Sequence, residues 1–139
     1  MTINDCKTIV FPTHSDCRGS LTLVDSTTVS ELLPFAPRRW FWIHSTPHGI
    51  TRGCHAHRTC WEIVTAISGQ LKLTLDDGLN SKSIILDNPR EGVVIPPMIW
   101  CKLSDFTEGC VCMALASEDY DTNGYINDYQ VFVKEIKND

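Results

Sequence analysis

The sequence lacks a long hydrophobic run and an excess of positive charge. No apolar stretch approaches the roughly 18 residues that a membrane-spanning helix requires, which excludes a helical membrane protein. The start of the chain also lacks the basic and then apolar pattern of a secretory signal, so we expect a cytoplasmic location. The net charge of −5 argues against general affinity for nucleic acid or for an anionic membrane surface.

A C-x-x-C pair is absent among the seven cysteines. Their number is odd and no export signal precedes them, which argues against a disulfide framework. Cys110 and Cys112 alternate within an apolar run, as small buried residues of a strand do. We therefore expect Cys110 and Cys112 to be buried thiols and no disulfide framework.

Acidic residues are absent between Arg38 and Trp61, although the chain as a whole is acidic. The same interval holds four arginines and four histidines, namely Arg38, Arg39, Arg52, Arg58, His44, His48, His55 and His57. An acidic protein that gathers cations in one segment is expected to bind an anion there. For any single arginine, the alternative is that it only solvates an exposed strand.

Repeats, linkers and low-complexity tracts are also absent, so we expect one domain over residues 1–139. Short runs of alternating apolar and polar residues, separated by turn signals, predict an all-β sandwich or barrel. The expected strands are Ser20–Asp25, Arg39–His44, Gly53–His57, Glu62–Ser68, Gln70–Leu75, Ser83–Leu86, Gly92–Ile95, Trp100–Ser104 and Cys110–Ala116. Asp77-Gly78 after the alternating run 71–75 predicts a hairpin turn.

Helical structure is expected to be sparse. One short helix is predicted at Ser26–Leu33, with Ser26 or Thr27 as its cap and Pro34 after its end. The polar and aromatic segment from Glu118 to Tyr129 is expected to form a turn or a short helix.

The segment from Gly49 to Gly69 is the most informative part of the chain. His55 and His57 are two residues apart, so both imidazoles project from the same face of an extended strand. Glu62 follows five residues later. Two histidines and a carboxylate suit either a metal site or proton transfer without a metal, and the spacing alone leaves both open.

The full spacing of this segment is Gly, five residues, His-x-His, four residues, Glu, six residues, Gly. It resembles the first motif of the cupin family, which implies an all-β double-stranded β-helix (jelly-roll barrel) with its site inside the barrel. Metal-binding cupins usually supply another histidine from a second motif, P-x-G-x-x-H. In the corresponding stretch of this chain, Met98 replaces the glycine and Cys101 stands in place of the histidine.

A narrower resemblance is carried by motifs spread over almost the whole chain. These are Asp16-Cys17-Arg18-Gly19-Ser20-Leu21, Arg52-Gly53-Cys54-His55-Ala56-His57, Leu75-Asp76-Asp77-Gly78, Ile95-Pro96-Pro97 with Trp100, Ser104-Asp105-Phe106, and residues 115–121 with Tyr125-Ile126. Together they resemble the sugar 3,4-ketoisomerases of the WxcM-like cupin group. The resemblance implies an isomerase that acts on dTDP-4-keto-6-deoxy-glucose in deoxysugar biosynthesis for surface polysaccharide. It also implies that no metal or other cofactor is needed, and a homodimer that exchanges N-terminal strands.

The resemblance also implies roles for individual residues. His55 matches the catalytic base, and His57 on the same strand face is expected to position the sugar or support the charge changes. The residues expected to bind substrate are Arg18, Arg39, Arg52, Trp42, Glu62 and Trp100. Arginines suit this role because the guanidinium group pairs bidentately with phosphate oxygens. Which histidine moves which proton stays open.

Some positions depart from the pattern of the family. Relatives typically carry tyrosines in the strand that reads Arg39-Trp40-Phe41-Trp42-Ile43 here, an amide at the position of Glu62, and a histidine or arginine near Cys101. A carboxylate at Glu62 is able to orient His57 or to ligate a metal. Two other functions therefore stay open: a metal-dependent cupin enzyme that uses His55, His57 and Glu62, and a non-catalytic domain that binds nucleotide sugars.

Overall fold

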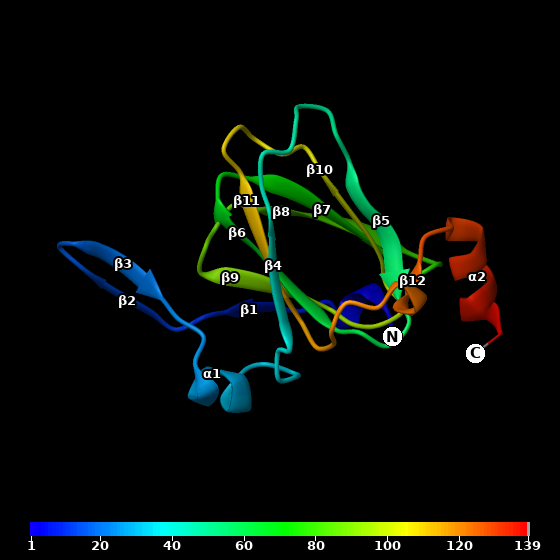
Figure 1. Cartoon of the computed structure of the whole chain (residues 1–139), viewed down its shortest axis with the longest axis horizontal. Helices are drawn as coiled ribbons and strands as arrows, with labels where there is room; N and C mark the ends of the chain where they lie inside the picture. Colours follow the sequence, from blue (N-terminus) through cyan, green and yellow to red (C-terminus); the bar gives the residue numbers. More distant parts are fainter. Residues whose placement is uncertain (139) are drawn as a thin grey trace.

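Two five-stranded antiparallel sheets face each other in the computed structural model, which describes residues 1–138 (Figure 1). The first sheet has the order β1 (Thr8–Val10), β9 (Glu91–Ile95), β6 (Glu62–Ser68), β11 (Val111–Ala116) and β4 (Arg39–Ile43). The second has the order β12 (Tyr125–Ile126), β5 (Arg52–His57), β10 (Trp100–Ser104), β7 (Leu71–Asp76) and β8 (Ser81–Leu86). The predicted all-β fold is therefore confirmed.

Alternation along each strand decides which side chains enter the space between the sheets. In β7, Leu71, Leu73 and Leu75 are fully buried, whereas the residues between them are partly exposed. Trp40 and Trp42 are the exposed residues of β4, so the side chains of Arg39, Phe41 and Ile43 face the interior. A period of two is what a half-buried strand requires.

The predicted hairpin at Asp77-Gly78 joins β7 to β8. The Asp77 carboxylate accepts hydrogen bonds from the backbone N–H groups of Leu79 (2.9 Å), Asn80 (2.8 Å) and Ile3 (2.9 Å). Gly78 has a φ of +93°, which an L side chain adopts only with strain. The turn thus closes the hairpin and also holds the start of the chain, where η1 (Ile3–Asp5) forms one short 3₁₀ turn.

The N-terminal region differs from the prediction. Strand β1 and the hairpin of β2 (Thr13–Asp16) with β3 (Gly19–Thr22) were not expected, apart from the overlap of β3 with the predicted strand Ser20–Asp25. The last paired residue of that strand is Thr22, opposite Thr13, and Asp25 caps the helix that follows. The β2–β3 hairpin extends away from the two sheets (Figure 1). The other predicted strands are present, with bounds shifted by at most two residues.

The first helix is α1 (Ser26–Glu31), slightly shorter than the predicted range. Its cap is Asp25 and not Ser26 or Thr27, because the Asp25 carboxylate accepts a hydrogen bond of 3.0 Å from the backbone N–H of Thr28. The prediction of the cap was wrong by one residue.

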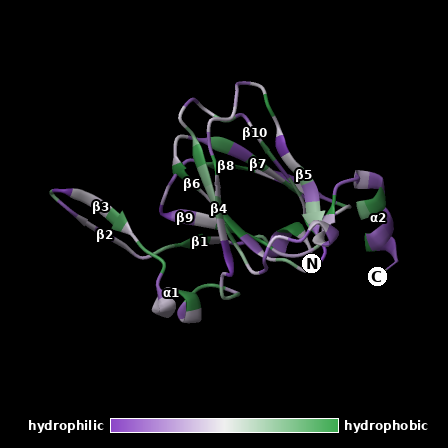
Figure 2. Ribbon diagram, in the orientation of Figure 1, coloured by the Kyte–Doolittle hydropathy of each residue, from purple (hydrophilic) through white to green (hydrophobic). Residues whose placement is uncertain are grey.

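The C-terminal helix α2 (Tyr129–Lys137) was not predicted. The segment before it forms η2 (Thr122–Gly124) and the short strand β12, so the expected turn or short helix between Glu118 and Tyr129 is present only as a single 3₁₀ turn. Asp128 caps α2. The helix alternates between hydrophobic and hydrophilic bands (Figure 2) and buries Phe132 against Ile126 and Ala56. Among residues 1–138, no helix is long and apolar enough to cross a membrane.

Candidate functional site

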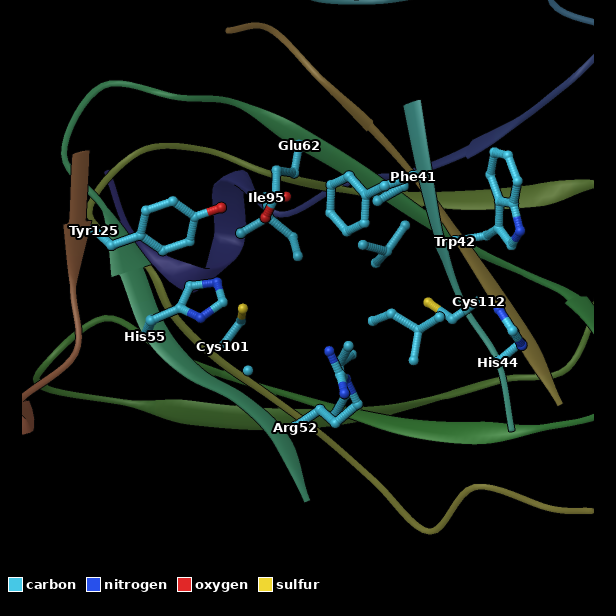
Figure 3. Close-up of a pocket in the computed structure, with 15 residues that line it drawn as sticks. Phe41, Trp42, His44, Arg52, His55, Glu62, Ile95, Cys101, Cys112 and Tyr125 are labelled. Atoms are coloured by element: carbon cyan, nitrogen blue, oxygen red, sulfur yellow. The ribbon is translucent and has the colours of Figure 1, made fainter. Parts of the chain in front are cut away.

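A cavity of about 470 Å³ opens between the two sheets. Its volume lies in the range usual for small-molecule sites. The lining residues come from both sheets and are Phe41, Trp42, Ile43, His44, Arg52, Gly53, His55, Glu62, Val64, Ile95, Cys101, Leu103, Cys112, Ala114 and Tyr125 (Figure 3). Apolar residues cover much of this wall, and a few polar groups converge on it.

Strand register places the polar groups. In the second sheet, Cys101 lies opposite His55 and Tyr125 lies opposite His57. Directly opposite residues of an antiparallel pair share a face, so these side chains meet. In the first sheet, Arg39, Ala116, Glu62 and Ile95 form one row across neighbouring strands. Because the two sheets face each other, Glu62 of the first sheet lies next to the histidines of the second.

A bulge in β5 sets the direction of His55. Gly53 and Cys54 both have positive φ angles, of +78° and +59°, and the register with β10 shifts between Cys101 and Lys102. A Cβ atom on Gly53 would lie 3.1 Å from the carbonyl oxygen of Cys101. Bulges of this kind re-aim the side chains that follow them.

The two histidines have different environments. Their rings are 4.9 Å apart between centroids and nearly perpendicular. His57 is buried, and its Nε2 atom lies 2.9 Å from Glu62 Oε1, with both side chains at most 6% exposed. This contact is at ion-pair distance, but the ring N–H direction does not align with the oxygen, so Nε2 has no well-directed hydrogen bond. His55 lies half-buried on the cavity wall.

Burial lowers the pKa of His55, and the neighbouring His57 acts in the same direction, while Glu62 opposes both. The ring of His55 is therefore neutral near pH 7. A neutral imidazole on a cavity wall is able to accept a proton from a bound molecule.

Arg39 and Tyr125 form a second polar pair at the site. Arg39 Nη1 donates a hydrogen bond of 3.3 Å to Tyr125 Oη. Burial raises the pKa of Tyr125, although Arg39 acts in the opposite direction. The phenol therefore stays protonated at neutral pH.

The structure brings most of the predicted site residues together. His55, Glu62 and Arg52 line the cavity, and His57 lies behind His55. Trp42 reaches the rim, but its ring is 63% exposed and points away from the cavity (Figure 3). Arg39 reaches the site through its hydrogen bond to a lining residue.

Two predicted substrate-binding residues lie elsewhere. Arg18 is on the β2–β3 hairpin, where it pairs with Asp16 at 2.6 Å and its side chain is 86% exposed. Trp100 packs against Tyr129 and Phe132 of α2 and does not line the cavity. Trp100 points outward because side chains alternate along β10, and Cys101, the next residue, takes the inward position.

The arginines and histidines between Arg38 and Trp61 also divide into residues inside and outside the cavity. Arg38 pairs with Asp119 at 3.3 Å, and Arg58 pairs with Glu135 at 2.9 Å. These two arginines therefore pair with nearby carboxylates at the surface. This agrees with the alternative to anion binding, in which a single arginine of this interval only serves an exposed strand. Arg52, His44 and His55 are the arginines and histidines of this interval that line the cavity.

Sequence reasoning did not single out Tyr125 or His44 as site residues, although both line the cavity. The motif Tyr125-Ile126 was noticed, but no role followed from it. Only the pairing of β12 with β5 shows that Tyr125 faces the histidines.

A metal ion has three candidate ligands here. The ligand atoms of His55, His57 and Glu62 lie within 4.8 Å of one another, and this donor set is competent for zinc or iron. Burial raises the pKa of Cys101 well above its usual value, so its thiol is neutral and is not a ready fourth ligand.

Two sheets around a cavity lined by histidines define a cupin-type double-stranded β-helix. Residues 4–137 match the model of the family described as FdtA, WxcM-like, C-terminal, and the chain belongs to this family.

Named relatives cover nearly the whole chain. The TDP-4-oxo-6-deoxy-alpha-D-glucose-3,4-oxoisomerase of Aneurinibacillus thermoaerophilus is 35% identical over 94% of this chain and 91% of the relative. QdtA, a sugar 3,4-ketoisomerase from Thermoanaerobacterium thermosaccharolyticum solved with TDP, is 34% identical, with a TM-score of 0.90 over 96% of both chains. A His-to-Asn mutant of QdtA was solved with TDP-4-keto-6-deoxyglucose, and this structure is 33% identical, with a TM-score of 0.90 over 96% of this chain and 95% of that chain. The predicted family and the cupin fold are thereby confirmed, and the named relatives are isomerases.

Proposed function

We propose that this protein is a nucleotide-sugar 3,4-ketoisomerase that moves the keto group of dTDP-4-keto-6-deoxy-glucose from C4 to C3 without a metal. The observation that carries the proposal is a neutral, half-buried His55 on the wall of a cavity in a chain of this family. The substrate is inferred from relatives named for TDP-sugar isomerisation.

The C3 hydrogen of this substrate is acidic because the C4 carbonyl stabilises the carbanion as an enediolate. In the proposed reaction, His55 removes the C3 proton and a proton is then delivered to C4. A positioned base contributes about 100-fold or more to such a step. The buried Glu62 lies close enough to offset the positive charge that His55 acquires, because Glu62 already acts to raise the pKa of His55.

The nucleotide would lie toward the open end of the cavity. Arg52 and His44 lie on this wall, and the cationic side chain of Arg52 points into the cavity (Figure 3). A diphosphate needs such partners, since charge-assisted hydrogen bonds from a guanidinium group are the strong ones. Phe41 lines the same cavity and is available for stacking with the sugar or thymine.

A second copy of the chain is proposed to complete the molecule. The β2–β3 hairpin extends from the sheets and exposes Leu21 by 59% (Figure 1). A second hollow of about 440 Å³ on the outer face of the first sheet includes Trp40, which is 56% exposed. In a homodimer with exchanged N-terminal strands, these apolar surfaces would be covered. The exchange would also carry Arg18 toward the partner.

One experiment separates the proposal from its alternatives. The purified protein is incubated with dTDP-4-keto-6-deoxy-glucose, and the position of the carbonyl carbon is followed by NMR, with and without a chelator. We expect the 3-keto product in both samples. Activity that is lost with the chelator and restored by iron or zinc would contradict the proposal in favour of a metal-dependent enzyme. Binding of dTDP without any product would favour a non-catalytic domain.

A further inference from the structure

Tyr125 lies in direct contact with both histidines. It is paired with His57 across β12 and β5, and the ring centroids of these two residues are 4.4 Å apart. The ring of Tyr125 is also 5.0 Å from that of His55. Figure 3 shows its hydroxyl group directed into the cavity, on the same side as Glu62. A polar group in this position faces whatever molecule His55 contacts.

The hydroxyl group of Tyr125 has an unused hydrogen. Its oxygen accepts a hydrogen bond from Arg39 Nη1 at 3.3 Å. Among residues 1–138, no side-chain or backbone oxygen accepts the hydrogen of this hydroxyl group. Burial raises the pKa of Tyr125, and the charged guanidinium group of Arg39 acts against this increase and would hold a phenolate at this position. A donor aimed into a cavity without a protein acceptor is placed to act on a ligand.

The reaction proposed above needs more than a carbon base. When the carbonyl moves from C4 to C3, the oxygen on C4 gains a hydrogen and the oxygen on C3 loses one. His55 is occupied with the carbon-bound proton during these steps. A second group must therefore donate to one oxygen and accept from the other.

Other groups near His55 are poorly placed for this transfer. The Nε2 atom of His57 faces Glu62 at 2.9 Å in the buried layer behind His55. The Cys101 thiol is buried, and a thiol is only a weak hydrogen-bond donor and acceptor. Arg52 is permanently charged and carries no acceptor. Among residues 1–138, Tyr125 carries the only hydroxyl group that lines the cavity, and a hydroxyl group both donates and accepts hydrogen bonds.

On the basis of the proposed function, we propose that Tyr125 is a second catalytic residue that moves the proton between the two substrate oxygens. His55 first takes the C3 proton, which forms the C3–C4 double bond and leaves an enolate charge on the C4 oxygen, and Tyr125 then donates its hydrogen to that oxygen. The resulting phenolate, held by Arg39, takes the hydrogen of the C3 hydroxyl group. The C3 carbonyl forms as a proton is returned to C4, and Tyr125 ends as the phenol with which it began.

Tyr125→Phe tests this role, because it removes the hydroxyl group and keeps the ring against the histidines. Tyr129→Phe is the matched control, since that hydroxyl group bonds Asp76 outside the cavity. Each protein is incubated with dTDP-4-keto-6-deoxy-glucose in D₂O. Two quantities are measured: the deuterium that enters C3 of recovered substrate, and the amount of product.

We expect Tyr125→Phe to lower the rate of product formation about 100-fold. Removal of the C3 proton depends on His55, so exchange into recovered substrate should fall much less, and the ratio of exchange to product should rise by about tenfold or more. A general loss of structure would lower both quantities together and leave their ratio unchanged. Affinity for dTDP should stay within a few-fold of the wild-type value, and Tyr129→Phe should behave as wild type.

The inference is overturned if exchange and product fall in proportion, or if neither changes. If the wild-type protein shows neither exchange nor product, the proposed function itself fails, and the role of Tyr125 fails with it. The wild-type sample thus distinguishes the two failures.

Discussion

Glu62 is the residue that gives His55 and His57 different roles. Its carboxylate lies against His57 in the buried layer and acts on His55 only through space. Burying a carboxyl group costs free energy unless it has a polar partner, and the Nε2 atom of His57 at 2.9 Å is the partner here. We infer that Glu62 fixes the position of His57 and compensates the charge that His55 acquires in the reaction.

Replacing Glu62 with glutamine tests this inference through pH dependence. Glu62 raises the pKa of His55, so its removal should lower that pKa further. Activity needs the neutral ring of His55, and the acidic limb of kcat/KM should therefore move to lower pH, while kcat falls about tenfold. The measurement is kcat/KM against pH for wild type, Glu62→Gln and the control Glu108→Gln, which changes an exposed carboxylate outside the cavity. A shift of the limb toward higher pH would contradict the role given to Glu62.

At the scale of elements, the cavity depends on a short strand and a helix at its edge. Strand β12 holds Tyr125 against β5, and its other residue, Ile126, packs with Phe132 of α2 and with Ala56. A two-residue strand has few hydrogen bonds of its own. The helix therefore secures one wall of the site from behind.

If α2 supports this wall, Phe132→Ala should lower the free energy of unfolding. Phe132 is fully buried, and removing such a ring typically costs about 3–5 kcal/mol of unfolding free energy. Val131→Ala, on the exposed side of the same helix, should cost less than about 1 kcal/mol. Chemical denaturation measures both values. Equal losses for the two variants would show that α2 does not secure the wall.

The strands of the two sheets could be predicted because their apolar residues alternate with a period of two. Leu71, Leu73 and Leu75 are an example. The turn at Asp77-Gly78 could be predicted because this residue pair is typical of hairpin turns, and the Asp77 carboxylate accepts a backbone hydrogen bond there. Helix α2 was missed because its apolar residues face a surface that exists only after β5 and β12 have paired. Its cap, Asp128, is visible in the sequence, but the tail was treated as polar and aromatic.

The site shows the same limit. Spacing within one strand was enough to place His55 and His57 on one face, and motif matching added Glu62 and Arg52. The position of Tyr125 depends on pairing between strands that are far apart in the sequence, which no local pattern reports. Trp100 was assigned to the site although the strand turns it outward, toward α2.

At the scale of the whole molecule, the described chain leaves a hairpin and an apolar face exposed. One family model matches residues 4–137, which supports a single domain. The exposed Leu21 and Trp40 then belong to the surface that a second copy is proposed to cover.

Leu21→Asp tests that arrangement. A charge buried between two copies has no partner and weakens association, so we expect a dimer for wild type and a larger monomer fraction for the variant. Leu79→Asp is the control, because Leu79 is 90% exposed on the β7–β8 turn. Sedimentation equilibrium measures the masses. A wild-type monomer at all concentrations would contradict the proposed exchange of strands.

The central claim is that His55 removes the proton from C3 of the sugar. The most direct measurement is the entry of deuterium from D₂O into the C3 and C4 positions of dTDP-4-keto-6-deoxy-glucose, compared between wild type and His55→Asn. We predict exchange and a displaced carbonyl with wild type, and a loss of both by about 100-fold or more in the variant, with dTDP still bound. Exchange that continues at the wild-type rate in His55→Asn would contradict the account.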